Sequence, residues 1–221
     1  MDLGTPLKSL GPVFRMKAKT LEKVGIVTVE DFLFYTPFRY DSNLIVSKIG
    51  DTQAGETVTV QGTVTSIANT FTKRGLSIQR ITIQDDTGRI ELTFFNQKFL
   101  INTVHKGDFL SAAGRVDKYG SRKTMAVRSY EILKSENDSA INTTGLVPIY
   151  PQTQNLSSKW IRGRIKTILD MLVSLEDYLP TNIKEQNQLM DLIDALRSIH
   201  FPKSQNEASN ARKRLSFDEL F

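Results

Sequence analysis

Few side chains in this sequence have the chemistry that catalysis or metal binding requires. The 221 residues include no cysteine and only two histidines, His105 and His200, which stand far apart. Thiol catalysis, disulfides and cysteine zinc sites are therefore excluded, and a histidine-rich metal site cannot form. No Gly-x-x-x-x-Gly-Lys-Ser/Thr loop is present to hold nucleotide phosphates. Asp85-Asp86, which precede Gly88, are expected to form a turn. We therefore expect no catalytic residue, no metal site and no cofactor in this chain.

Phe94-Phe95-Asn96 is the local pattern with the clearest functional meaning. In the strand expected at 89–96, Phe94 follows apolar neighbours inward, and Phe95 shares the outer face with polar residues. Phe99 comes four residues later and is expected to present its ring beside Phe95. An exposed aromatic ring can stack on an unpaired base. The alternative is that both rings cover the end of a barrel or dock on another domain, and the pattern alone favours neither.

Positive charge is concentrated in the middle of the chain. The 29 Lys and Arg against 24 Asp and Glu give a net charge of +5. Basic and acidic residues number 7 and 6 in residues 1–55, 12 and 7 in 56–134, and 10 and 11 in 135–221, for net charges of +1, +5 and −1. A concentrated positive field attracts polyanions such as nucleic acid. The alternative is a surface that lysines keep soluble.

The middle segment, 56–134, has the pattern of a small barrel. Val- and Thr-rich runs with turn residues between them predict five strands, at 57–67, 76–84, 89–96, 109–117 and 123–133, and a short helix at 97–104. A phase shift between Ile78 and Ile81 predicts a bulge in the second strand. Five strands with one helix between the third and fourth indicate an OB-fold barrel.

Two loops of this barrel are expected to contact nucleic acid. OB folds bind oligonucleotides on strands two and three and on the loops that join strands one to two and four to five. Those loops are here Phe71–Gly75 and Lys118–Lys123, and each is basic with one aromatic residue. The candidate DNA-binding residues are Phe95, Phe99, Lys73, Arg74, Arg80, Tyr119, Arg122 and Lys123.

Helices are expected on both sides of the barrel, which makes the fold class α+β. Residues 1–55 are predicted to contain a helical hairpin and a connector that is mostly loop, with Thr28 capping the second helix. Residues 135–221 are predicted to contain a polar linker and further helices. Arg162 and Arg212–Arg214 are expected on solvated helix faces, and His200 as a structural histidine with satisfied hydrogen bonds.

Five stretches of the chain occur together, in the same order, in one protein family. They are Thr28–Tyr40, Asp86–Gln97, Val147–Pro151 with Leu156–Lys159, Ile199–Pro202, and Ala211–Phe221. The second of them reads Asp-Thr-Gly-Arg-Ile-Glu-Leu-Thr-Phe-Phe-Asn-Gln. Together they resemble the N-terminal region of the bacterial RecG-type ATP-dependent DNA helicases, over nearly the whole chain.

The resemblance implies a role on DNA. RecG-type helicases remodel stalled replication forks and other branched DNA in recombination and repair. Their OB-fold wedge domain binds the branch point and splits the arms while two helicase domains pump duplex using ATP. In relatives, aromatic residues at and just after the Phe-Phe-Asn motif stack on bases at the junction, and these positions match Phe95 and Phe99. ATP and Mg²⁺ are expected only for the helicase motor domains.

The resemblance also sets expectations for the setting of the chain. The family continues from Asp218–Phe221 into its motor, so the sequence predicts a non-catalytic part of a helicase: a truncated product, the first half of a split gene or a deliberately made fragment. Its expected partners are branched or single-stranded DNA and motor domains in cis or in trans, and it is expected to be a cytoplasmic, nucleoid-associated monomer. The alternatives are a protein-interaction OB module and an inert scaffold half of a split helicase.

Overall fold

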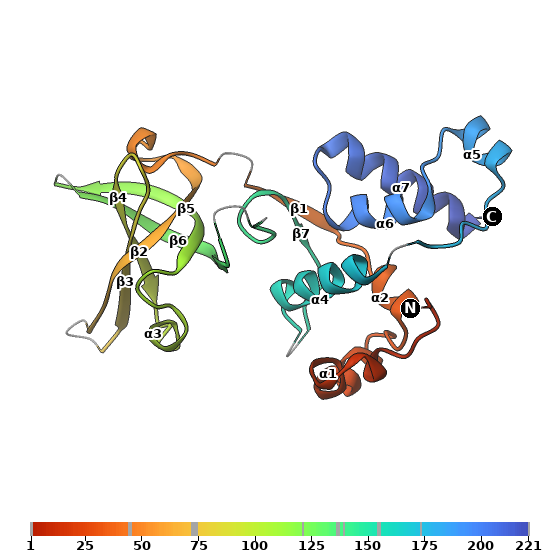
Figure 1. Cartoon of the computed structure of the whole chain (residues 1–221), viewed down its shortest axis with the longest axis horizontal. Coiled ribbons are helices and arrows are strands. Elements are labelled where there is room, and N and C mark those ends of the chain that lie inside the picture. Colours follow the sequence, from red (N-terminus) through yellow and green to blue (C-terminus); the bar gives the residue numbers. More distant parts are fainter. Residues whose placement is uncertain are drawn as a thin grey trace. The chain divides into compact units, whose positions relative to one another are not determined.

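The structure is a computed structural model that describes residues 2–43, 46–71, 75–120, 122–135, 138, 140–153, 156–172 and 174–220. Contacts divide the chain into two units (Figure 1). One unit is Ser42–Val147, and the other combines Met1–Asp41 with Pro148–Phe221. The sequence predicted three consecutive segments instead. The first and last of these contribute to one unit because helices from both ends of the chain share a single hydrophobic core.

The unit Ser42–Val147 is built around a closed five-stranded barrel. Its strands are β2 (Thr57–Phe71), β3 (Ser77–Gln84), β4 (Arg89–Phe95), β5 (Phe109–Tyr119) and β6 (Arg122–Leu133), closed in the order β2-β3-β4-β6-β5. Neighbouring strands run antiparallel except β4 and β6, which are parallel. Helix α3 (Leu100–Thr103) lies between β4 and β5 in the chain and at one end of the barrel (Figure 1). This order of strands and helix is the one predicted for an OB fold.

Alternate residues of each strand fill the barrel. Val60, Ile81 and Leu92 are completely buried in one apolar cluster, which α3 extends through Leu100. Gly62 allows the strands to approach closely, since a Cβ atom there would lie 2.6 Å from the carbonyl oxygen of Gln84. The close packing of β2 on β3 at this point therefore depends on a residue without a side chain.

The prediction of a bulge between Ile78 and Ile81 is wrong. Strand β3 pairs with β4 in continuous register from Ile78 opposite Phe95 to Gln84 opposite Arg89. The register shift lies instead in β2, between Val64 and Ser66. The inward row of β3 simply changes from apolar to polar at Ser77 and Gln79, which are both fully buried. Two buried polar residues on the inner face thus produce the same sequence pattern as a bulge that shifts the alternation by one residue.

The second unit is mainly helical. Its elements are η1 (Leu7–Leu10), α1 (Pro12–Glu22), α2 (Val29–Leu33), α4 (Ser158–Met171), α5 (Thr181–Asn187), α6 (Leu192–His200) and α7 (Gln205–Leu220). Thr28 caps α2 as predicted: its Oγ1 accepts a hydrogen bond from Asp31 N, and the Asp31 carboxylate accepts one from Thr28 N. Phe14, Phe32 and Trp160 pack ring against ring in the core. None of the helices in the described ranges is long and apolar enough to cross a membrane.

Short elements join the two units along the chain. Strands β1 (Arg39–Asn43) and β7 (Gly145–Ile149) form a two-stranded sheet, and η2 (Ile49–Asp51) precedes β2. Residues 38–55 were expected to be mostly loop. Main-chain pairing with β7 defines β1, and the side chains of residues 39–42 are not buried, so the sequence there shows no apolar alternation.

Two arginines predicted to be solvated are buried. Arg162 donates from Nη1 to the carbonyl oxygen of Pro148 at 2.7 Å. Arg214 has no exposed side-chain surface and binds Asp177 through Nη2 at 2.8 Å and Asp218 through Nε at 2.9 Å. Helix periodicity cannot reveal such sites, because Pro148 and Asp177 lie outside the helices of their arginines.

His200 is a buried structural histidine, as predicted. Its Nδ1 lies 2.7 Å from the Tyr150 hydroxyl, and its Nε2 lies 2.7 Å from the carbonyl oxygen of Leu33. Burial lowers the pKa of His200 to about 4. The ring is therefore neutral at pH 7 and joins α6 to the end of α2.

We expect Asp177→Asn to lower the free energy of unfolding at pH 7 by about 3 kcal/mol, because it leaves a buried guanidinium with Asp218 as its one anionic partner. Hydrogen bonds from Arg214 hold the pKa of the Asp177 carboxyl well below its usual range. Its stabilisation is therefore present above the unfolded pKa of about 4 and is lost as the pH falls through the folded value. Urea unfolding followed by the fluorescence of Trp160, the single tryptophan, measures this unit.

The matched control is Asp170→Asn, which breaks an exposed pair with Lys166. That variant should stay within about 0.5 kcal/mol of the parent chain. A stability difference between parent and Asp177→Asn that is absent at pH 7, or that grows toward pH 3, would contradict the assignment.

Candidate nucleic-acid interface

Phe95 is the last residue of β4, and its side chain faces outward. The exposed fraction is 52% for Phe95 and 1% for Phe94. Phe94 packs edge-on against Tyr130, with ring centroids 5.3 Å apart. The predicted orientation of these two neighbours is confirmed, because a strand that sends Phe94 into the barrel must send Phe95 out.

A tight turn after β4 presents Phe99 near the same end of the barrel. Asn96 adopts the left-handed conformation, with φ of 56°, which asparagine tolerates better than most residues. Its N–H donates to the carbonyl oxygen of Ser77 at 2.8 Å. The chain then enters α3, and Phe99, the residue before the helix, is 56% exposed. Two large exposed rings thus flank one three-residue turn, Asn96–Lys98.

The predicted basic loops are described in part. Lys73 and Arg74 of the β2–β3 loop lie outside the described residues. In the β5–β6 turn, Tyr119 pairs with Arg122 and is 83% exposed, and Gly120 adopts a φ of 61°. This turn therefore offers one exposed ring beside one exposed guanidinium-bearing residue.

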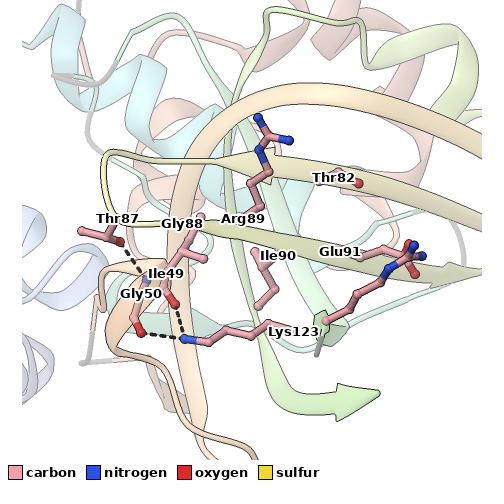
Figure 2. Close-up of a pocket in the computed structure, with 10 residues that line it drawn as sticks. Ile49, Gly50, Thr82, Thr87, Gly88, Arg89, Ile90, Glu91 and Lys123 are labelled. Carbon is pink, nitrogen blue, oxygen red and sulfur yellow. Dashed lines mark hydrogen bonds between the residues drawn. The ribbon is translucent and has the colours of Figure 1, made fainter. Parts of the chain in front are cut away.

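A cleft of about 520 Å³ opens on the barrel beside this turn. Its walls include Arg89, Arg122 and Lys123, together with the carboxylate residue Glu91. Figure 2 shows the Lys123 side chain extending to η2, where Nζ donates to the carbonyl oxygens of Ile49 at 2.8 Å and Gly50 at 2.6 Å. The sequence predicts Lys123 as a phosphate contact; the structure shows its ammonium group bonded to η2.

Arg80 and Arg89 lie on the outer face of the barrel, each with a polar neighbour. Arg80 Nε lies 3.6 Å from the Glu91 carboxylate, with about half of the arginine side chain exposed. Arg89 Nε donates to the side-chain oxygen of Gln84 at 2.7 Å. A bound phosphate would therefore compete with one carboxylate and one amide for these guanidinium groups.

The Asp85–Gly88 turn is structural, as predicted. Asp85 Oδ1 accepts hydrogen bonds from the backbone N–H groups of Thr87 and Gly88 at 2.8 and 2.9 Å, and Oδ2 accepts from Ile49 N at 2.8 Å. Burial acts to raise the pKa of Asp85, but these hydrogen bonds outweigh it and lower the pKa. In the ranges that the structure covers, no three acidic or histidine side chains are grouped to hold a metal ion.

The model of the RecG wedge domain family matches residues 6–172 of this chain. The chain belongs to the RecG wedge domain family. The matched range contains the whole barrel, the turn that holds Phe95 and Phe99, and helices of the other unit. The family resemblance inferred from the five sequence stretches is therefore confirmed.

Individual relatives agree with this family. Over the full length of this wedge chain, the ATP-dependent DNA helicase RecG of Synechocystis is 31% identical and that of Thermotoga maritima is 29% identical. A solved structure described as RecG bound to a three-way DNA junction matches the whole chain with a TM-score of 0.75 and 27% identity. The chain spans 28% of each of the two helicases and 30% of the solved chain, so it corresponds to one part of such a helicase.

Because Asn96 has a positive φ, the stability of the barrel should depend on the residue type at this position. Asn96→Val should lower the free energy of unfolding of the barrel by about 1–2 kcal/mol, because a β-branched residue is strained at positive φ. Asn96→Gly should cost less than half of that, since glycine adopts this conformation freely. Chemical denaturation followed by circular dichroism of the sheet compares the two variants. Equal stability of the two would argue against a strained turn.

Proposed function

We propose that this chain is the DNA-binding wedge of a RecG-like helicase, which recognises branched DNA such as stalled forks and junctions and splits the strands there. The observation behind this proposal is the pair of exposed rings, Phe95 and Phe99, on a tight turn of a closed barrel. The related solved structure, RecG bound to a three-way DNA junction, supports the choice of a branched DNA as the ligand.

Stacking explains why such a surface would prefer a branch point. Bases inside a duplex are already stacked on their neighbours, whereas a base at a branch point has lost one neighbour or its partner. A ring that covers such a base typically contributes about 1–3 kcal/mol. Two rings held by one barrel would cover opened bases without first being ordered, which lowers the entropic cost of binding.

Phosphate contacts would supply affinity that does not depend on branching. The barrel segment has a net charge of +5, and its cleft holds Arg89, Arg122 and Lys123. Cationic side chains that neutralise phosphates release counterions, so binding weakens steeply with salt. On this proposal the cleft and the β5–β6 turn hold the backbone, and the rings select the opened bases.

The proposal places the chain beside a helicase motor. ATP and Mg²⁺ would be used by the motor domains, joined in cis or in trans, and this chain would act as a monomer on the DNA of the nucleoid. Its contribution to recombination and repair would then be to hold the branch while the motor moves the duplex.

Phe95→Ala should weaken binding to a forked DNA by about 1–3 kcal/mol, roughly 5- to 150-fold, and leave binding to plain duplex nearly unchanged. The loss arises because one stacking surface is removed from opened bases that a duplex does not offer. Gel-shift titrations of fork and duplex at fixed salt measure both affinities.

Phe38→Ala is the matched control, because Phe38 is 57% exposed and lies outside the barrel unit. It should bind both DNAs like the parent chain. An equal loss on fork and duplex for Phe95→Ala would count against stacking at the branch.

Arg122→Ala should weaken fork and duplex binding to a similar extent, and the slope of log affinity against log salt should shallow by about 1. The reason is the loss of a single phosphate contact that both DNAs share. Lys8→Ala, which removes an exposed charge from the helical unit, serves as the control. If partner proteins but no DNA are bound, and charge reversal in the barrel leaves that unchanged, a protein-interaction module becomes the better description.

A further inference from the structure

Beneath the turn that holds the two rings, the inner face of β3 carries polar side chains. Ser77 and Gln79 occupy the inward row that Ile81 and Ile83 continue as apolar residues, and all four are completely buried. A buried amide is unfavourable unless its hydrogen bonds are made. The buried carboxamide of Gln79 therefore requires hydrogen-bond partners inside the barrel.

The carboxamide of Gln79 is fully engaged with its neighbours. Its Nε2 donates to Ser77 Oγ at 2.6 Å and to Asn69 Oδ1 at 3.0 Å. Its Oε1 accepts a hydrogen bond from the backbone N–H of Gln97 at 2.9 Å. The first two bonds hold the amide in one orientation, and the third reaches the turn between Phe95 and Phe99.

The turn is thus fastened to β3 at two successive amides. Asn96 N donates to the Ser77 carbonyl oxygen, which any residue at position 77 would provide. The bond from Gln97 N has a side-chain acceptor, so it depends on the residue at position 79. A leucine there would be as apolar as the rest of the core, but it would leave the Gln97 N–H without this acceptor.

We propose that Gln79 is a positioning residue, which acts through the Gln97 amide to hold Phe95 and Phe99 in the arrangement that stacks on opened bases. This inference rests on the proposed DNA-binding function and adds the means by which the barrel interior controls it. A rigid turn presents both rings without an ordering cost, whereas a relaxed turn must be ordered at each binding event.

A double-mutant cycle with the full chain tests this role. Gln79→Leu should weaken fork binding about tenfold and leave duplex binding unchanged, since only the ring arrangement is affected. In the Phe95→Ala background, Gln79→Leu should cause a smaller loss than in the parent chain, because Phe99 is then the one ring left for it to position. Gln61→Leu is the matched control in the same barrel: its Nε2 bonds to Ser111 Oγ, away from the turn, and fork binding should be unchanged.

Amide hydrogen exchange supplies a readout that needs no DNA. In Gln79→Leu, exchange at Gln97 should accelerate about tenfold, while amides in the middle of β3 and β4 keep the protection of the parent chain. A general loss of stability would instead accelerate exchange throughout the barrel.

Separate results overturn the inference and the proposed function. If Phe95→Ala binds forks like the parent chain, the proposed stacking function fails. If Phe95→Ala is defective, the inference is overturned by a Gln79→Leu variant that keeps full fork preference, that weakens duplex equally, or whose loss adds fully to that of Phe95→Ala. Should Gln79→Leu fail to fold, Asn69→Ala, which removes one hydrogen-bond partner of the amide from an exposed residue, decides by the same criteria.

Discussion

Alternation of side chains along β4 is the constraint on which the whole interface depends. A closed barrel has a single interior, and each strand sends every second residue into it. Phe94 enters and packs against Tyr130, so Phe95 must leave. Because β4 ends at Phe95, the chain turns at once and brings Phe99 to the surface as well. A slip of one residue would bury Phe95 and expose Phe94, which would remove the site.

The proposed interface combines two kinds of interaction on this barrel. Stacking on exposed rings responds to whether bases are opened and depends little on salt, whereas contacts between arginines and phosphates respond to charge and weaken with salt. Arg89 and Arg122 of the cleft belong to β4 and β6, and Lys123 braces η2 through two carbonyl oxygens. The barrel thus fixes both sets of groups on one frame, as the proposed binding of a branched DNA requires.

Features that depend on local sequence were predictable. The five strands, the outward ring of Phe95, the cap at Thr28 and the turn at Asp85 follow from period-two alternation and from side chains that bond to nearby backbone. Features that depend on distant partners were not. The sequence places Arg214 in solvent because its partner Asp177 comes 37 residues earlier. The pattern around Gln79 indicates a bulge because its partner Gln97 lies beyond the next strand. For the candidate site, orientation was therefore predictable, and the hydrogen bonds that fix it were not.

The most direct test of this account places a fluorescent base analogue, 2-aminopurine, at the branch point of a fork. Its emission depends on stacking, so binding of the chain should change it, and Phe95→Ala should abolish most of that change at saturating protein. The same analogue placed several base pairs inside a duplex arm should respond little to the parent chain. An equal response at both positions, or one that persists in full when Phe95 and Phe99 are both replaced by alanine, would contradict the claim that these rings meet the opened bases.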